Sequence, residues 1–182
     1  TVDLSLPAVT NNSGLSLSYW INSGATTPLS NYTTAGAGTY YIKGTDVNGC
    51  YDIKPVTVTI NTTPTVTTSN TASVCTDSST NIVLTATTAS TFSWTIGTIT
   101  GTVNGANAGS GSTISQVLTS SGNGGTVVYN VTPTSSLGCI GTAYPITVSV
   151  NTVPVVTTQP ETINEVCAGT SANAVFIAEA SG

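Results

Sequence analysis

The chain has 182 residues, of which only 5% are charged: two are Lys or Arg, seven are Asp or Glu, and the net charge is −5. Nucleic acid and anionic membranes are excluded as expected partners, because clustered Lys and Arg hold both. Ser and Thr make up about a third of the residues. Hydroxyl groups are therefore expected to provide much of the surface hydration that charged groups provide in an average soluble domain. No apolar run reaches the roughly 18 to 20 residues of a membrane-spanning helix, so no direct membrane insertion is expected.

A long internal repeat predicts the domain boundaries. Residues 37–66 and 124–156 both contain Gly-Thr, a β-branched and aromatic run, a Gly-Cys turn, a Pro, a Val/Ile/Thr run and Asn-Thr-x-Pro. A period near 90 residues indicates units of immunoglobulin size. We therefore expect three units: 1–61, a repeat that lacks its N-terminal strand; 62–151, a complete repeat; and 152–182, the start of a third.

In chain order, the first unit shows apolar residues at every second position in three runs. This alternation is typical of strands with one buried face. The runs contain Leu15, Leu17, Tyr19 and Ile21, then Tyr40 and Ile42, then Val56, Val58 and Ile60.

The middle unit repeats the pattern and adds strands near residues 64–74 and 112–118. Its alternating positions are Ile82, Leu84 and Ala86, then Trp94 and Ile96, then Val127, Tyr129 and Val131, then Ile146, Val148 and Val150. Six or seven such strands predict an all-β, two-sheet sandwich of immunoglobulin type. Because Pro64 and Pro154 leave only short joints between units, we expect an end-to-end array of tandem sandwiches.

Four cysteines and no Met suggest an oxidising, extracellular setting, in which four thiols allow three pairings. The repeat register selects among these pairings. Cys75 lies in the opening strand of the middle unit and Cys139 near its last hairpin, so a structural disulfide between them is expected. Cys50 is the counterpart of Cys139 and Cys167 that of Cys75, so their partners are expected outside the fragment.

Two further groups of residues have a functional and a structural interpretation. Asp46, Asn48 and Asp52 resemble a calcium loop, although Asn48-Gly49 is also a hairpin-turn signal and the turn is favoured. Trp20 and Trp94 are either sugar-stacking platforms or core residues, and the core is favoured for both. Tyr41 and Tyr129 are also expected to be core aromatics.

The sequence predicts neither an enzyme nor a cofactor. Hydrolysis needs a general base, but the chain has no His, and its seven carboxylates do not recur as a pair in the repeats. Metal binding is disfavoured because no Cys-x-x-Cys spacing exists. The expected catalytic, cofactor and metal residues are therefore none, apart from the weak calcium candidate.

The repeats resemble the immunoglobulin-like and PKD-like repeats of giant Bacteroidota cell-surface proteins of the gliding-motility adhesin type. In the first unit the resemblance rests on the segments "YWINSGATTPLSN" and "AGTYYIKGTDVNGCYDIKPVTVTIN". In the middle unit it rests on "VCTDSSTNIVLTATT" and "TFSWTI". The third unit opens alike with "EVCAGTSANAVFIAEASG". The resemblance implies type IX secretion and display as a long extracellular fibre.

The leading hypothesis is therefore a structural stalk segment of a large secreted adhesin or filament at the bacterial cell surface. Its expected partners are neighbouring repeats, and surface polysaccharide or other cell-surface proteins. Two alternatives remain open: a carbohydrate- or protein-binding module, and a spacer attached to a secreted hydrolase. Exposed aromatic clusters would favour the binding module.

Overall fold

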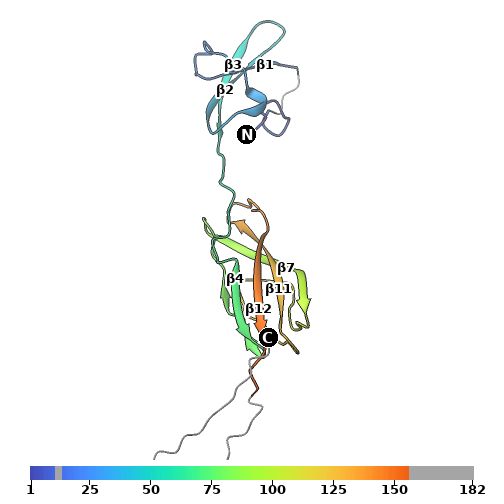
Figure 1. Ribbon diagram of the computed structural model, residues 1–182. Coiled ribbons are helices and arrows are strands. Elements are labelled where there is room, and N and C mark those ends of the chain that lie inside the picture. Colours follow the sequence, from blue (N-terminus) through green and yellow to red (C-terminus); the bar gives the residue numbers. More distant parts are fainter. Residues whose placement is uncertain (11–13, 156–182) are drawn as a thin grey trace, which may run out of the picture. The chain divides into compact units, whose positions relative to one another are not determined.

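A computed structural model describes residues 1–10 and 14–155 of the chain (Figure 1). The chain divides into two compact units, Thr1–Thr62 and Thr63–Gly182, called unit 1 and unit 2. Apart from a 3-10 turn, η1 (Tyr32–Thr34), the regular structure of the described residues is β-strand, which confirms the all-β prediction. The predicted third repeat lies almost wholly outside the described residues.

Unit 1 contains one antiparallel sheet of three strands. These are β1 (Ser16–Trp20), β2 (Gly38–Thr45) and β3 (Tyr51–Val58), in the order β1-β2-β3. One face of the sheet packs on a small core. The buried members of this core are Leu4, Leu29, Ala35 and Val58.

Register decides which face each side chain of unit 1 takes. Tyr19 lies opposite Ile42, and both share the core face because paired residues of adjacent strands point to the same side. Trp20 lies opposite Tyr41, one position further along each strand. Trp20 and Tyr41 therefore point away from the core.

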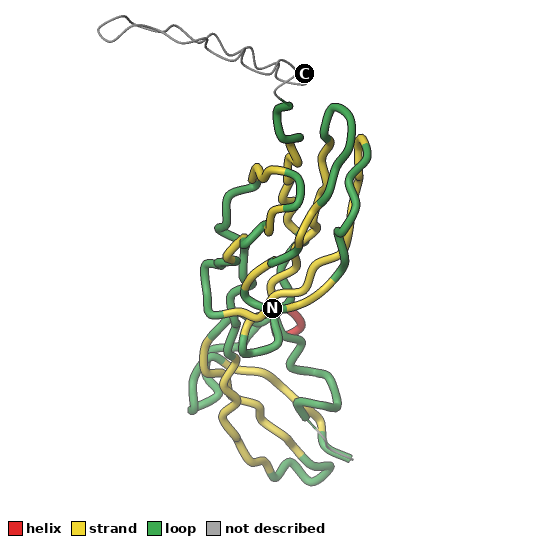
Figure 2. The backbone as a smooth tube through the Cα atoms, turned by 90° about the horizontal axis from the view of Figure 1, so that it is seen from below, coloured by secondary structure: helices red, strands yellow, loops and turns green. Residues whose placement is uncertain are grey.

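Unit 2 is a sandwich built on a five-stranded sheet, four strands of which are labelled in Figure 1. Figure 2 shows the strands of the chain in yellow, with the loops that join them in green. The sheet order is β4 (Thr71–Cys75), β12 (Tyr144–Asn151), β11 (Gly125–Ser135), β7 (Ser90–Gly101) and β8 (Gly109–Ser110). Two ladders form the opposite layer: β5 (Ser78–Ser79) with β10 (Val117–Leu118), and β6 (Ile82–Val83) with β9 (Thr113–Ile114).

The core of unit 2 lies between these layers and uses the alternating positions expected from the sequence. Val127, Tyr129, Ile146 and Val148 are fully buried, and Trp94 is 6% exposed. From the opposite layer, Ile82, Leu84, Ile114 and Leu118 complete the cluster. The middle repeat therefore contains a continuous hydrophobic core of its own.

The first and last strands of the unit 2 sheet are neighbours and run parallel, with Thr71 opposite Thr147 and Cys75 opposite Asn151. The other pairings of this sheet are antiparallel. Just before β12, the carbonyl oxygen of Pro64 occupies the place where a side chain on Gly141 would begin. The chain therefore enters unit 2 at one end of β12 and leaves it at the other.

The opposite placement of the two tryptophans predicts unequal effects on stability. Trp94→Ala should lower the free energy of unfolding of unit 2 by about 3–5 kcal/mol, because it removes a buried aromatic and leaves a cavity. Trp20→Ala should lower that of unit 1 by less than about 1 kcal/mol, as for a surface substitution. Hydrogen exchange followed by mass spectrometry measures each unit separately, and equal losses would contradict the assignment of faces.

Candidate functional site

The hairpin between β2 and β3 uses its first acidic residue to close a turn. Asp46 Oδ1 accepts the backbone N–H of Asn48 at 2.9 Å and that of Cys50 at 2.8 Å. Gly49 has φ +85°, a left-handed conformation that favours glycine. The turn interpretation of "TDVNGC" therefore accounts for Asp46, Asn48 and Gly49 without a cation.

The third calcium candidate has a different partner. Asp52 Oδ2 lies 2.8 Å from Lys54 Nζ, and both side chains are exposed. The hydrogen bond from Lys54, and then that from the Ile53 backbone, holds the pKa of the Asp52 carboxyl below its usual range. Within residues 1–10 and 14–155, no group of three or more His, Cys, Asp or Glu is placed to hold a metal ion.

The structure contradicts the expected Cys75–Cys139 disulfide. Both thiols are free, as is Cys50. Cys75 lies opposite Asn151 at the end of β12, whereas Cys139 lies beyond Ser135, in the turn that precedes β12. The eight residues of β12 separate these two places, a length of about 25 Å at the usual rise per residue, and disulfide geometry allows only about 4.4–6.8 Å between Cα atoms.

The error arose from strand direction. The sequence prediction placed Cys75 in the opening strand and this strand beside the last hairpin. However, only Pro64, upstream of β4, lies beside that turn, against Gly141, and the start of β4 lies opposite Thr147. Because β4 runs parallel to β12, the cysteine at its last position is carried to the far end of the sandwich. Cys50 is exposed and free, and Cys167 lies outside the described residues.

Trp94 and Tyr129 lie in the core, where two polar residues satisfy their polar atoms. Trp94 Nε1 donates to the carbonyl oxygen of Asn107 at 3.1 Å, and the Tyr129 hydroxyl donates to Gln116 Oε1 at 2.9 Å. Gln116 Nε2 donates to the same Asn107 carbonyl at 2.7 Å, and Asn107 N–H donates back to Gln116 Oε1 at 2.9 Å. Sequence reasoning missed both residues, because Asn107 lies outside the predicted strands and Gln116, inside the strand predicted near 112–118, carries no sequence signal for its polar contacts.

Burial determines the protonation of this network. It raises the pKa of Tyr129 to about 12, so its hydroxyl stays a hydrogen-bond donor at neutral pH. Gln116 Oε1 accepts two hydrogen bonds in this state. The arrangement is that of a structural network that orients the aromatic core.

The expectation that Trp20 and Tyr41 are core residues is wrong. Both are partly exposed, neither belongs to the core cluster of unit 1, and they face away from it. Tyr19 and Tyr40, one position earlier in each strand, pack against that cluster instead. A shift of one residue moves a side chain to the other face of a sheet, and the alternation of Leu15, Leu17, Tyr19 and Ile21 already excluded Trp20 from the core face.

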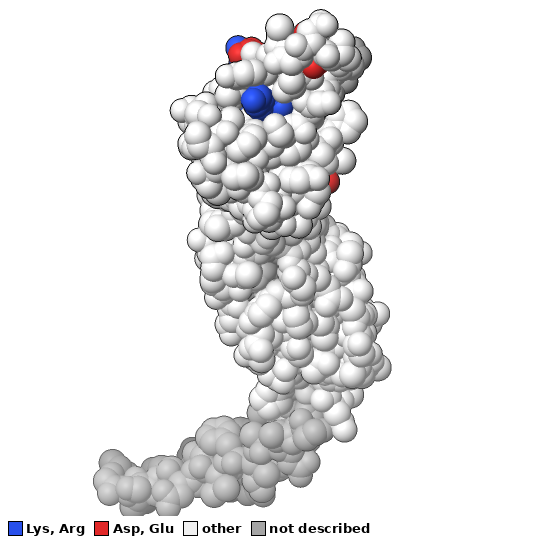
Figure 3. Space-filling model, turned by 90° about the horizontal axis from the view of Figure 1, so that it is seen from above, with Lys and Arg blue, Asp and Glu red and all other residues white. Residues whose placement is uncertain are grey.

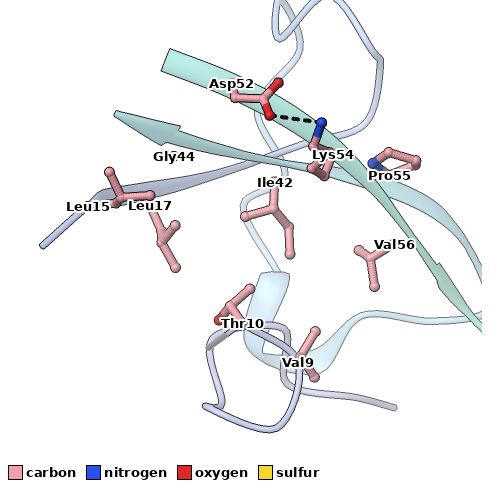
Figure 4. A pocket seen from close by; sticks show the side chains of 10 residues that line it. All are labelled: Val9, Thr10, Leu15, Leu17, Ile42, Gly44, Asp52, Lys54, Pro55 and Val56. Carbon is pink, nitrogen blue, oxygen red and sulfur yellow. Dashed lines mark ion pairs between the residues drawn. The ribbon is translucent and has the colours of Figure 1, made fainter. Parts of the chain in front are cut away.

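A hollow of about 370 Å³ opens on the core face of unit 1, beyond the part that the core covers (Figure 4). Leu17, Ile42 and Val56 line it from the three strands, and Val9 lines it from the N-terminal loop. Asp52 and Lys54 contribute the ion pair drawn in Figure 4. Its lining suits contact with an apolar group, and Lys54 and Asp52 are the charged residues beside it.

Charge is distributed unequally between the two units. Five of the six charged side chains among the described residues lie in unit 1, and Asp77 is the sixth. Figure 3 shows red and blue atoms gathered over one part of an otherwise uncharged surface. Among the described residues, no helix is long and apolar enough to cross a membrane.

Comparison with known proteins gives one family match. Residues 72–154 match the family model of the PKD-like domain, a segment that extends from β4 to just beyond β12. The strands of the unit 2 sheet thus lie in a segment whose sequence is similar to the PKD-like domain. The solved fibronectin(III)-like modules of Clostridium thermocellum CbhA are 15% identical, with a TM-score of 0.35, over 76% of this chain and 78% of that chain. No curated protein matches the chain.

The raised pKa of Tyr129 predicts how unit 2 responds to alkali. The folded state holds this proton to a higher pH than the unfolded chain, so the stabilisation is complete below pH 10 and is lost as pH rises from about 10 to about 12. Tyr129→Phe should remove this loss and lower stability at pH 7 by roughly 0.5–1.5 kcal/mol, the net contribution of one hydrogen bond. Urea unfolding from pH 7 to pH 12 measures both effects, with Tyr144→Phe as the control that retains the slope.

The positions of the thiols predict that the stability of unit 2 is the same with and without a reductant. A bridge closing the loop from Cys75 to Cys139 would contribute about 4 kcal/mol. We expect instead that the Cys75→Ser/Cys139→Ser variant unfolds within about 0.5 kcal/mol of the parent chain, with or without dithiothreitol. A peptide containing Cys75 linked to Cys139 in a non-reducing digest of the monomer would disprove this placement.

Proposed function

We propose that the chain is a stalk segment of a large secreted protein of the bacterial cell surface, of adhesin or filament type. The observation that carries this proposal is the path of the chain through unit 2. It enters beside Gly141 and leaves after Asn151, at opposite ends of β12. A module with its two ends far apart adds its full length to any series of such modules.

The parallel pairing of β4 and β12 suits a segment under tension. A pull on both ends of unit 2 draws the start of β4 one way and the end of β12 the other way. The backbone hydrogen bonds of a parallel ladder are evenly spaced along the strands, so this pull loads them together instead of one at a time. Resistance to forced unfolding depends on the unfolding rate, which such shared loading keeps low.

The remaining properties fit a spacer. The outward positions of the unit 2 sheet carry hydroxyl and amide groups, such as Ser93, Thr95, Asn130 and Thr132, which hydrate a surface without creating a strong field. In the proposal, Asn-Thr-x-Pro joints connect successive sandwiches into an end-to-end array, and export follows the type IX route. The segment itself has no enzymatic activity, and its neighbours in the chain are its first partners.

Single-molecule pulling on the full chain tests the role of the β4–β12 ladder. The Asn70 carbonyl accepts from the Thr147 N–H, and the Thr76 N–H donates to the Asn151 carbonyl. Alternate residues of a strand form their backbone hydrogen bonds with the same neighbouring strand. Val74 therefore belongs to the set that bonds β12, whereas the N–H of Cys75 points away. Val74→Pro should lower the unfolding force of unit 2 strongly, and Cys75→Pro, at the open edge of the sheet, should lower it little.

Two results of the pulling experiment would contradict a load-bearing role of the β4–β12 ladder. If both proline variants unfold at the force of the parent chain, the ladder does not carry the load and the stalk proposal loses its main support. If both lower the force equally, backbone strain and not the lost donor is the cause. Chemical unfolding of the same variants provides the correction for differences in equilibrium stability.

A further inference from the structure

The sheet of unit 1 has an outward face that differs from the rest of the described surface. Six of its side chains come from all three strands and are apolar, aromatic or cationic. We call this set the aromatic face: Trp20 from β1, Tyr41 and Lys43 from β2, and Tyr51, Ile53 and Pro55 from β3. None of the six belongs to the core cluster of unit 1, and Tyr51 is 62% exposed.

Three members of the aromatic face form a row across the strands. Trp20 lies opposite Tyr41, and Tyr41 lies opposite Pro55. Such cross-strand neighbours have Cβ atoms about 4.5–5.5 Å apart, so the row is about 10 Å wide. Trp20 Nε1 donates to Ser18 Oγ at 2.9 Å, which fixes the indole ring against its own strand.

The charge on this face is positive. Lys43 Nζ lies 3.8 Å from the centroid of the Tyr51 ring, a cation–π contact that holds the ammonium at the surface. The three strands place no carboxylate on this side of the sheet, because Asp52 shares the opposite face with Ile42. A cation without a neighbouring acid, in a chain of net charge −5, is complementary to an anionic group.

Unit 2 shows that the fold itself does not require these residues. "FSWTI" and "LSYWI" are the matching strands of the two units, and Tyr19 occupies the place of Trp94, which leaves Trp20 at the place of Thr95. Across from Thr95 lies Asn130, whereas across from Trp20 lies Tyr41. The cross-strand pair at this outward place is thus polar and uncharged in unit 2 and aromatic in unit 1.

We propose that the aromatic face of unit 1 binds an acidic polysaccharide. The apolar faces of successive sugar rings stack on Trp20 and Tyr41, which offer flat, amphipathic surfaces, and a sugar carboxylate pairs with Lys43. Hydroxyls of Ser16, Ser18 and Thr45, on the same side of the sheet, are placed to bond sugar hydroxyls. The inference does not depend on the stalk proposal, since a stalk unit with this face would also be an attachment point.

Isothermal titration of the full chain with oligosaccharides of alginate tests the proposal, because alginate is a polymer of uronic acids. Dextran serves as the neutral probe. We expect alginate to bind with a Kd below about 1 mM and dextran to bind at least tenfold more weakly. Trp20→Ala should weaken alginate binding at least tenfold. Lys43→Gln should weaken it and should also reduce its dependence on salt.

Lys54→Gln is the matched control, because Lys54 is the other lysine of the chain and lies on the opposite face of the same sheet. It should leave alginate binding unchanged. Circular dichroism verifies that each variant is folded, and Tyr51→Ala, at an exposed position, replaces Trp20→Ala if the latter unfolds. Absence of alginate binding, equal binding of dextran, or equal losses in Lys43→Gln and Lys54→Gln would overturn the proposal.

Discussion

The alternation of side chains between the two faces of a strand is the constraint on which most of this structure depends. In unit 2 it places Val127, Tyr129 and Val131 in one layer with Ile146 and Val148. In unit 1 the same rule gives Tyr19 and Tyr40 to the core and Trp20 and Tyr41 to the outside. Each doublet of adjacent aromatics is thereby divided between two functions, since one ring stabilises the unit and its neighbour meets solvent.

Much of the fold could be predicted because it is expressed in local patterns. The repeat predicted a boundary at residue 61, beside the observed one at Thr62, and the period of two predicted the burial of Trp94 and Tyr129. Likewise, the Asn-Gly signal predicted the turn that Asp46 closes. These features depend on residues that are close together in the sequence, so local sequence patterns are enough to predict them.

The features that were missed depend on contacts between distant segments or on phase. The Cys75–Cys139 bridge failed because the direction of β4 relative to β12 is a property of the whole sheet. Asn107 and Gln116 were missed because their partners, Trp94 and Tyr129, are brought close only by the closed sandwich. Trp20 was misplaced although the alternation of Leu15, Leu17, Tyr19 and Ile21 contained the answer, because the preference of sandwich tryptophans for the core was applied to Trp20 and Trp94 alike.

The separation of Cys75 from Cys139 has a consequence for how unit 2 matures. A domain whose thiols are held at opposite ends of its longest axis does not close a covalent ring on itself, so its native state is the same in reducing and oxidising surroundings. Folding then needs no disulfide isomerase and no particular order of oxidation. The two thiols remain available to react with groups outside the domain. Whether they form such covalent links then depends on how oxidising the surroundings are, whereas folding depends on the hydrophobic core.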